Sequence, residues 1–191
     1  YSSNLYQGQK EPYGMERIEL LRGAVSVLYG NAAPGGIINT VSKRPTQETL
    51  RELNLELGSF HRKQVSADFG GRLSEDGAWS YRLTGLLRDS DSFVDHVQDN
   101  RTFLAPALTW RPSTTTSLTV LAQYKETESK YIYALPAIGT VKPSNHGRLS
   151  RSTFIGEPGA DRYQDQARSI GYLLEHAFSD QVRLRRNVRL D

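Results

Sequence analysis

The chain has 191 residues, with 24 Lys and Arg against 21 Asp and Glu, so it carries a net charge of +3 and is long enough for one average domain or two small ones. No stretch approaches the ~18–20 consecutive apolar residues of a spanning helix, which excludes a helical membrane protein. Apolar and aromatic residues occur throughout, which argues against a disordered chain, and the small, evenly spread charge gives no reason to expect a nucleic-acid partner.

Residue types that carry out chemistry are scarce or scattered. The chain has no cysteine, which rules out a disulfide, a thiolate metal site and a thiol nucleophile. Its four histidines lie far apart, and none has the spacing of a metal-binding motif. The glycines of residues 30–35 match the spacing of a phosphate loop, but Gly36 and Ile37 follow where Lys and Ser or Thr are required. No nucleophile and base form a recognisable pair, so we expect no enzyme.

Residues 1–45 are rich in glycine and turn signals. Residues 16–20 alternate polar and apolar side chains, which predicts a short strand, and residues 24–29 fit a single helical turn. Residues 37–41 are rich in β-branched side chains and predict a second strand. These pieces indicate a small α+β unit that is too short to bury a core of its own.

From Glu48 onward, apolar and polar side chains alternate with a period of two, which is the period of a β-strand. The pattern predicts seven strands of roughly ten residues, each with one apolar and one polar face. They are centred on residues 53–57, 64–69, 79–88, 104–110, 118–124, 170–178 and 182–190.

Strands of this length and pattern are typical of a membrane barrel, in which a spanning strand needs about 9–11 residues with the apolar face outward. The connections alternate as they do in outer-membrane barrels, where turns are tight on one side and loops are long on the other. The turns at 74–77, 112–114 and 178–180 are tight, whereas the links at 89–100 and 126–165 are long. The first hairpin, at 58–62, is an exception because it is short on the long-loop side.

Two observations keep an alternative open. A soluble β-sandwich or small barrel also has two-faced strands and frequent turns, so the chain could be a soluble all-β ligand- or carbohydrate-binding module. In addition, Arg186 shares the parity of Leu184 and Val188. An arginine that faces lipid costs about 2–4 kcal/mol at the bilayer midplane, but little near an interface, where the side chain can reach water.

A long motif joins the two regions. It reads MERIELLRGAVSVLYG over residues 15–30 and PGGIINTVSKRP over residues 34–45. This motif strongly resembles the end of the plug domain of TonB-dependent siderophore receptors. The similarity continues through YRLTG at 81–85, APALTWRP at 105–112 and GTV at 139–141, which look like the ferrichrome (hydroxamate) receptor branch of that family.

The resemblance implies a mainly β fold with two parts. Residues 1–45 would be the C-terminal part of an α+β plug domain. Residues 46–191 would be about the first seven strands of a 22-stranded transmembrane antiparallel β-barrel. The chain would then be a fragment of a bacterial outer-membrane receptor, not competent for transport alone, because an open sheet in lipid leaves unpaired strand edges.

The resemblance also implies partners. The parent receptor would take up a ferric siderophore, either ferrichrome or another hydroxamate, and would contact outer-membrane lipid. The energy would come from TonB and its inner-membrane complex, acting through a box that these residues lack. Iron would arrive already chelated, so we expect no cofactor and no protein side chain that ligates the metal.

Three tyrosines are candidate ligand contacts by resemblance. Tyr131 and Tyr133, at the start of the long loop, would line the siderophore pocket, although Ile132 and Ala134 stand where the branch has further aromatics. A tyrosine offers a flat apolar face and a hydroxyl, which suit a chelate with an organic rim. The alternative for both is a place in an interfacial aromatic belt. Tyr6 would be a ligand contact from the plug or a residue of ordinary plug packing.

Arg22 is a candidate latch between plug and barrel. In the family, the arginine at this place pairs with barrel glutamates, which would lie beyond Asp191. A buried, unpaired arginine is costly, so without those partners Arg22 should turn to solvent or pair with Glu16 or Glu19.

Overall fold

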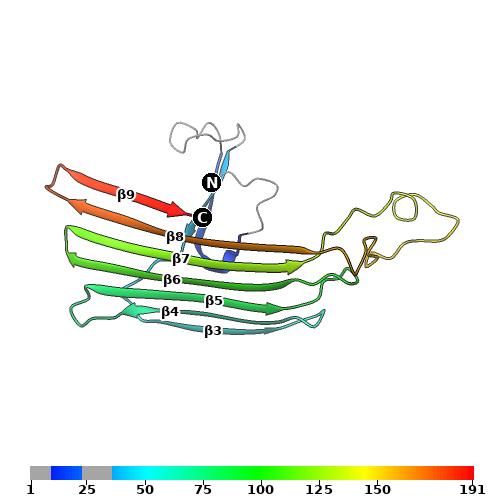
Figure 1. Ribbon diagram of the computed structural model, residues 1–191, viewed down its shortest axis with the longest axis horizontal. Helices are drawn as coiled ribbons and strands as arrows, with labels where there is room; N and C mark the ends of the chain where they lie inside the picture. The colour runs from blue at the N-terminus through cyan, green and yellow to red at the C-terminus, as the bar shows by residue number, and fades with distance from the viewer. Residues whose placement is uncertain (1–9, 23–35) are drawn as a thin grey trace.

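The computed structural model describes residues 10–22 and 36–191 (Figure 1), and nearly all of its regular structure is β. A short 3-10 helix, η1 (Pro12–Gly14), precedes two strands, β1 (Met15–Leu21) and β2 (Ile37–Ser42), that pair antiparallel with each other. The predicted helical turn at 24–29 lies outside the described residues. Within them, no helix is both long and apolar enough to cross a bilayer.

The second sheet contains seven strands in the order of the chain, each antiparallel to the next. This confirms the seven predicted strands and the mainly β fold. The strands are β3 (Leu50–Leu57), β4 (Lys63–Arg72), β5 (Trp79–Asp89), β6 (Asn100–Ser113), β7 (Thr116–Ser129), β8 (Tyr163–Ala177) and β9 (Arg183–Leu190).

The connections alternate along the sheet as the sequence predicted (Figure 1). Tight turns join β4 to β5, β6 to β7 and β8 to β9 at one end, and the long loops 90–99 and 130–162 lie at the other. The β7–β8 loop is shorter than expected because pairing continues to Ser129 opposite Tyr163. The short first hairpin turns through Phe60 and His61, which both have positive φ, and closes with Gly58 N–H donating to Arg62 O at 3.0 Å.

In the large sheet the apolar face is exposed and the polar face is buried, which is the reverse of the arrangement in a soluble protein. Large apolar side chains on one face are exposed; they include Leu83, Leu87, Leu104, Val120 and Ile170. Polar side chains on the other face are buried; they include Asp68, Arg82, Thr84, Arg101, Thr119 and Lys125. A soluble sheet buries its apolar face, so this arrangement fits a wall with lipid outside and a polar interior.

The segment around η1 and β1 covers the polar face at close range. Gly14 lies against the ring of Phe103, and a Cβ added to Gly14 would come within 2.2 Å of that ring. Only glycine fits there without displacing the aromatic side chain, so this contact fixes where the chain enters the β1–β2 sheet.

The apolar face carries polar side chains toward its long-loop end. Tyr124 donates to Glu126 at 2.7 Å, and the guanidinium of Arg168 lies 5.6 Å from the centre of the Tyr124 ring.

Arg186, on the strand at the edge of the sheet, shares the apolar face as its parity predicted and lies 5.8 Å from the centre of the Tyr172 ring. The ring gives this cation a favourable partner on an otherwise apolar surface.

We expect single cysteines to distinguish the two faces of the large sheet when the protein is embedded in a lipid bilayer. Cysteines in place of Leu83 and Val120 should be shielded by lipid, whereas those in place of Gln123 and Ser169 should react with a water-soluble thiol reagent. The second pair is half-buried and lines a small cavity of about 280 Å³ between the sheet and β2, which water can fill. Equal labelling of the four sites in the bilayer would contradict the assignment of one lipid-facing side and one water-facing side to the sheet.

Candidate ligand-binding site

A cavity of about 670 Å³ opens at the long-loop end of the sheet, on its polar face. It is bounded by the β3–β4 turn, the β5–β6 loop, the end of β7 and the start of the β7–β8 loop. The lining combines aromatic and aliphatic side chains, among them Phe60, Phe93, Ile132 and Tyr163, with charged groups. A pocket of this kind binds an organic molecule with a few polar groups on its rim.

The structure places the three candidate tyrosines differently. Tyr131 lines the cavity, with its ring edge-to-face against Tyr163 at 5.2 Å, and remains 54% exposed. Tyr133 is similarly exposed but is not among the described residues that line the cavity. Tyr6 lies outside the described residues. Of the two described tyrosines, the structure therefore brings Tyr131 to the cavity.

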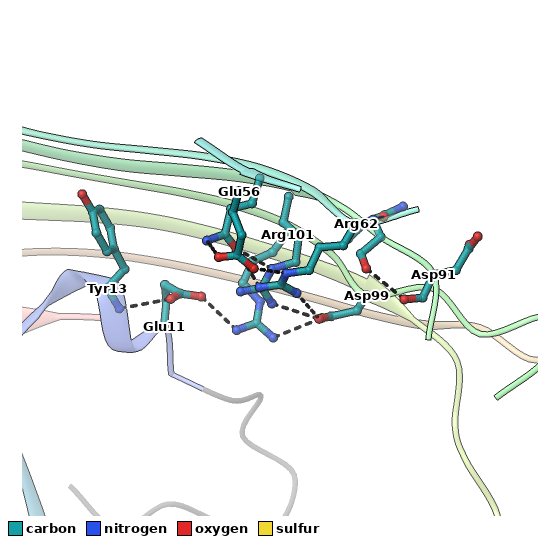
Figure 2. A network of polar contacts seen from close by, with 11 residues as sticks. Glu11, Tyr13, Glu56, Arg62, Asp91, Asp99 and Arg101 are labelled. Atoms are coloured by element: carbon teal, nitrogen blue, oxygen red, sulfur yellow. Dashed lines mark hydrogen bonds and ion pairs between the residues drawn. The ribbon is translucent and has the colours of Figure 1, made fainter. Parts of the chain in front are cut away.

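Three arginines converge on one carboxylate at the floor of the cavity (Figure 2). Asp99 lies 2.9 Å from Arg88 Nη1, 3.6 Å from Arg101 Nη2 and 3.8 Å from Arg62 Nη1. Arg62 also donates a hydrogen bond to Glu56, which belongs to β3. Arg62 comes from the β3–β4 turn, Arg88 from β5 and Arg101 from β6, so two adjacent strands and a neighbouring turn hold the floor in place.

One of these arginines connects the cavity to the segment before β1. Arg101 Nη1 donates to Glu11 Oε2 at 2.9 Å, and both side chains are almost fully buried (Figure 2). The other carboxylate oxygen of Glu11 accepts from Tyr13 N–H at 3.1 Å, so the same side chain caps η1. Arg101 Nε is buried without a hydrogen-bond partner, an arrangement that costs about 1–3 kcal/mol.

A second network joins the large sheet to the segment that precedes it in the chain. Asp68 is 1% exposed and accepts two hydrogen bonds of 2.9 Å from Arg82, and one of 2.7 Å from Lys43. Arg82 also donates to Glu16 on β1 at 2.8 Å and to the carbonyl of Arg44. Each charge in this buried cluster therefore has an opposite partner, as burial requires.

The candidate latch, Arg22, is exposed in the structure. The two glutamates expected as substitute partners have other contacts: Glu16 binds Arg82, and Glu19 accepts from Arg17 at 2.5 Å and from Asn39 at 2.7 Å. These hydrogen bonds hold the pKa of Glu19 below its ordinary value, and the contribution from Arg17 is the largest.

The described residues hold no group of three or more His, Cys, Asp or Glu side chains that could bind a metal ion. The cavity offers aromatic surface and guanidinium donors, which bind and orient a ligand. Sequence reasoning missed the arginines of the floor, although the two-residue period of β6 places Arg101 on the polar face. The contact with Glu11 joins residues 90 apart, and no local pattern reports such a pair.

Comparison with known proteins gives consistent relatives, although no family model matches the chain. The ferrichrome outer membrane transporter/phage receptor of Escherichia coli is 40% identical over 180 residues, covering 94% of this chain and 24% of the relative. The ferrioxamine B receptor of Salmonella typhimurium is 34% identical over 180 residues, covering 94% of this chain and 26% of the relative. The chain thus spans about a quarter of the length of these curated relatives.

Solved structures agree with the sequence relatives. The pyoverdine outer membrane receptor of Pseudomonas aeruginosa, bound to pyoverdine, matches with a TM-score of 0.81 at 27% identity over 91% of this chain and 26% of its own. The chain is similar to one segment of outer-membrane siderophore receptors. The open form of the ferric-catecholate import receptor of E. coli, at 21% identity, shares the fold with a TM-score of 0.84 over 93% of this chain and 28% of its own.

These relatives bear on the two interpretations of the strand pattern. They support the receptor and not the soluble all-β module. The relatives named here are transporters and receptors, in agreement with the expectation that the chain is no enzyme.

Proposed function

We propose that the chain forms part of a TonB-dependent outer-membrane receptor that takes up a ferric siderophore of the hydroxamate class. The observation that carries this proposal is the inverted sheet, which buries Asp68, Arg82 and Arg101 on one face and exposes leucines on the other. Such a sheet is stable only with lipid against the apolar face and a filled or wet interior behind the polar face. The relatives that transport ferrichrome or bind ferrioxamine supply the ligand class.

In this proposal, residues 1–45 are the end of the plug and residues 46–191 are the first strands of the barrel wall. The two ion-pair networks support that division, because each joins the segment before residue 46 to the polar face of the large sheet. TonB and its inner-membrane complex would supply the energy, since an outer membrane has no ion gradient or nucleotide of its own to drive uptake.

The cavity supports a bound chelate and not a bare ion. Its volume of about 670 Å³ is the size of a small-molecule pocket. Tyr131 and Tyr163 provide flat apolar surface for the organic rim, and the arginines provide donors for oxygen atoms of the ligand. We therefore propose that the siderophore supplies all the ligands to iron and that the protein contributes no resident cofactor.

Uptake in cells tests the proposal. The full receptor that carries residues 1–191 is produced in a Gram-negative strain that lacks its own hydroxamate receptors, and accumulation of iron supplied as ferrichrome or ferrioxamine is measured. We expect accumulation that requires TonB and is absent when iron is supplied as a catecholate complex. A protein that purifies folded from the aqueous fraction and binds sugars instead would favour the soluble module.

A further inference from the structure

Two loops contribute side chains to the lining of the 670 Å³ cavity. The β5–β6 loop supplies Phe93 and Val97, and the start of the β7–β8 loop supplies Lys130 and Tyr131. A ligand that contacts both loops binds best if their relative position is fixed before it arrives, because ordering a loop on binding costs affinity. The contacts that fix this position therefore matter for binding, even where they lie outside the cavity.

The β5–β6 loop is held firmly by its own contacts. Ser92 N–H donates to Val97 O at 2.8 Å, and Asp99 N–H donates to Ser90 O at 2.7 Å, so the loop is closed at its base. Val94 and Val97 are almost fully buried, at 4% and 3% exposure. Buried apolar contacts and hydrogen-bonded backbone resist local opening, which makes this loop the firm side of the cavity.

The β7–β8 loop contains no helix or strand, so its contacts with neighbouring segments decide where it lies. It meets the β5–β6 loop at two nearby points. Asp95 N–H donates to Ser152 O at 2.8 Å, and the ring of Phe154 lies edge-to-face against His96, with 6.2 Å between the ring centres. Gly156 leaves room for the Phe154 ring, because a Cβ at that position would come within 2.6 Å of it.

Phe154 also contacts the start of its own loop. The Lys130 Nζ lies 5.9 Å from the centre of the Phe154 ring, within the range of a cation–π contact. The same Nζ donates to Pro158 O at 2.5 Å, which adds a second link between the two ends of the loop. The Phe154 ring thus contacts both His96 on the firm side of the cavity and Lys130, the residue before Tyr131.

We propose that Phe154 is a positioning residue for ligand binding, which holds Tyr131 at the cavity from a place outside its lining. Neither Phe154 nor His96 is among the described residues that line the cavity. The ring holds Lys130 near the β5–β6 loop, and the adjacent Tyr131 is thereby kept against Tyr163, 5.2 Å away. This inference rests on the proposed function, since it concerns the ligand of the same cavity.

Binding of ferrichrome and of ferrioxamine B to the full-length protein in detergent tests the inference, with heat-modifiable gel mobility as a check of assembly. Phe154→Ala removes the ring. His96→Asn removes its aromatic partner and keeps a residue type that tolerates the positive φ of 63° at this position. Ile155→Ala is the matched control, because Ile155 is the next residue, is 46% exposed and is not among the described lining residues. The Phe154 and His96 changes are also made in a Tyr131→Ala background.

We expect Phe154→Ala to weaken binding of the chelate by about fivefold, through the loss of its contacts with His96 and Lys130. His96→Asn should weaken binding by about two- to threefold, since one of these contacts remains. Ile155→Ala should change affinity by less than about twofold. In the Tyr131→Ala background, Phe154→Ala should add less than about twofold, because the side chain that it positions is already gone.

Each contrary result has a distinct meaning. If Phe154→Ala binds as tightly as the unmodified protein, or weakens binding equally with and without Tyr131, the inference is wrong while the proposed function stands. A loss in Ile155→Ala as large as that in Phe154→Ala has the same consequence. If Phe154→Ala fails to assemble, His96→Asn decides by the same two comparisons. An unmodified protein that assembles and binds neither chelate contradicts the proposed function itself.

Discussion

Replacing Asp68 by alanine in the full-length protein is expected to destabilise the packing of the segment before β3 against the large sheet by about 3–5 kcal/mol, the cost of removing one member of a buried ion pair. Asp68 is 1% exposed and accepts hydrogen bonds from both Arg82 and Lys43. Without it, two cations remain close together in a buried site, with Glu16 as the nearest remaining carboxylate. The measurement is the denaturant midpoint of the folded, heat-modifiable band.

A matched control and a double variant test whether the loss of stability comes from the unpaired buried charge. Asp180 is an exposed aspartate in the β8–β9 turn, so Asp180→Ala should change stability by less than about 0.5 kcal/mol. Combining Asp68→Ala with Arg82→Met should recover part of the loss, because the second change removes the unpaired buried charge. A single Asp68→Ala variant as stable as the control would show that the network contributes nothing to the packing of that segment against the large sheet.

The strands of the large sheet could be predicted well because side chains alternate between two faces along each strand, and this period is visible in the local sequence. Alternation along β5 and β7 places Leu83 and Val120 on one face and Arg82 and Thr119 on the other, and the observed burial follows that division. Tight turns could also be placed, because turn-forming residues such as Gly77 mark them in the local sequence. Strand ends were less certain, because pairing beyond residue 126 depends on the partner strand and not on local composition.

The site was harder to predict because its parts are distant in the sequence. The floor of the cavity joins Arg62, Arg88 and Asp99 from separate turns and strands, and Glu11 comes from the segment before the large sheet. Only the register of the whole sheet brings these residues together. Resemblance matched Tyr131 to an aromatic of the branch and gave Tyr133 only as a substitute from a neighbouring position, but it could not show which of them lines a cavity.

Replacing Tyr131 by alanine is expected to weaken binding of a ferric hydroxamate by about tenfold or more, since truncating an aromatic anchor in a pocket commonly costs more than about 1–2 kcal/mol. The Tyr131 ring lines the cavity and packs edge-to-face on Tyr163. Tyr133 is equally exposed but does not line that cavity among the described residues, so Tyr133→Ala is the matched control and should change affinity by less than about threefold.

The same pair of variants separates the pocket from the aromatic belt. Both tyrosines lie in the 130–162 loop beyond the last pairing of β7 with β8, so neither supports strand pairing. A pocket role for Tyr131 therefore leaves assembly intact and lowers affinity. A belt role predicts the reverse, with slower or incomplete assembly and unchanged affinity. Binding of the ferric hydroxamate is measured beside heat-modifiable mobility on the same preparations. A Tyr131→Ala receptor that assembles fully and binds as tightly as the unmodified protein would remove this tyrosine from the site.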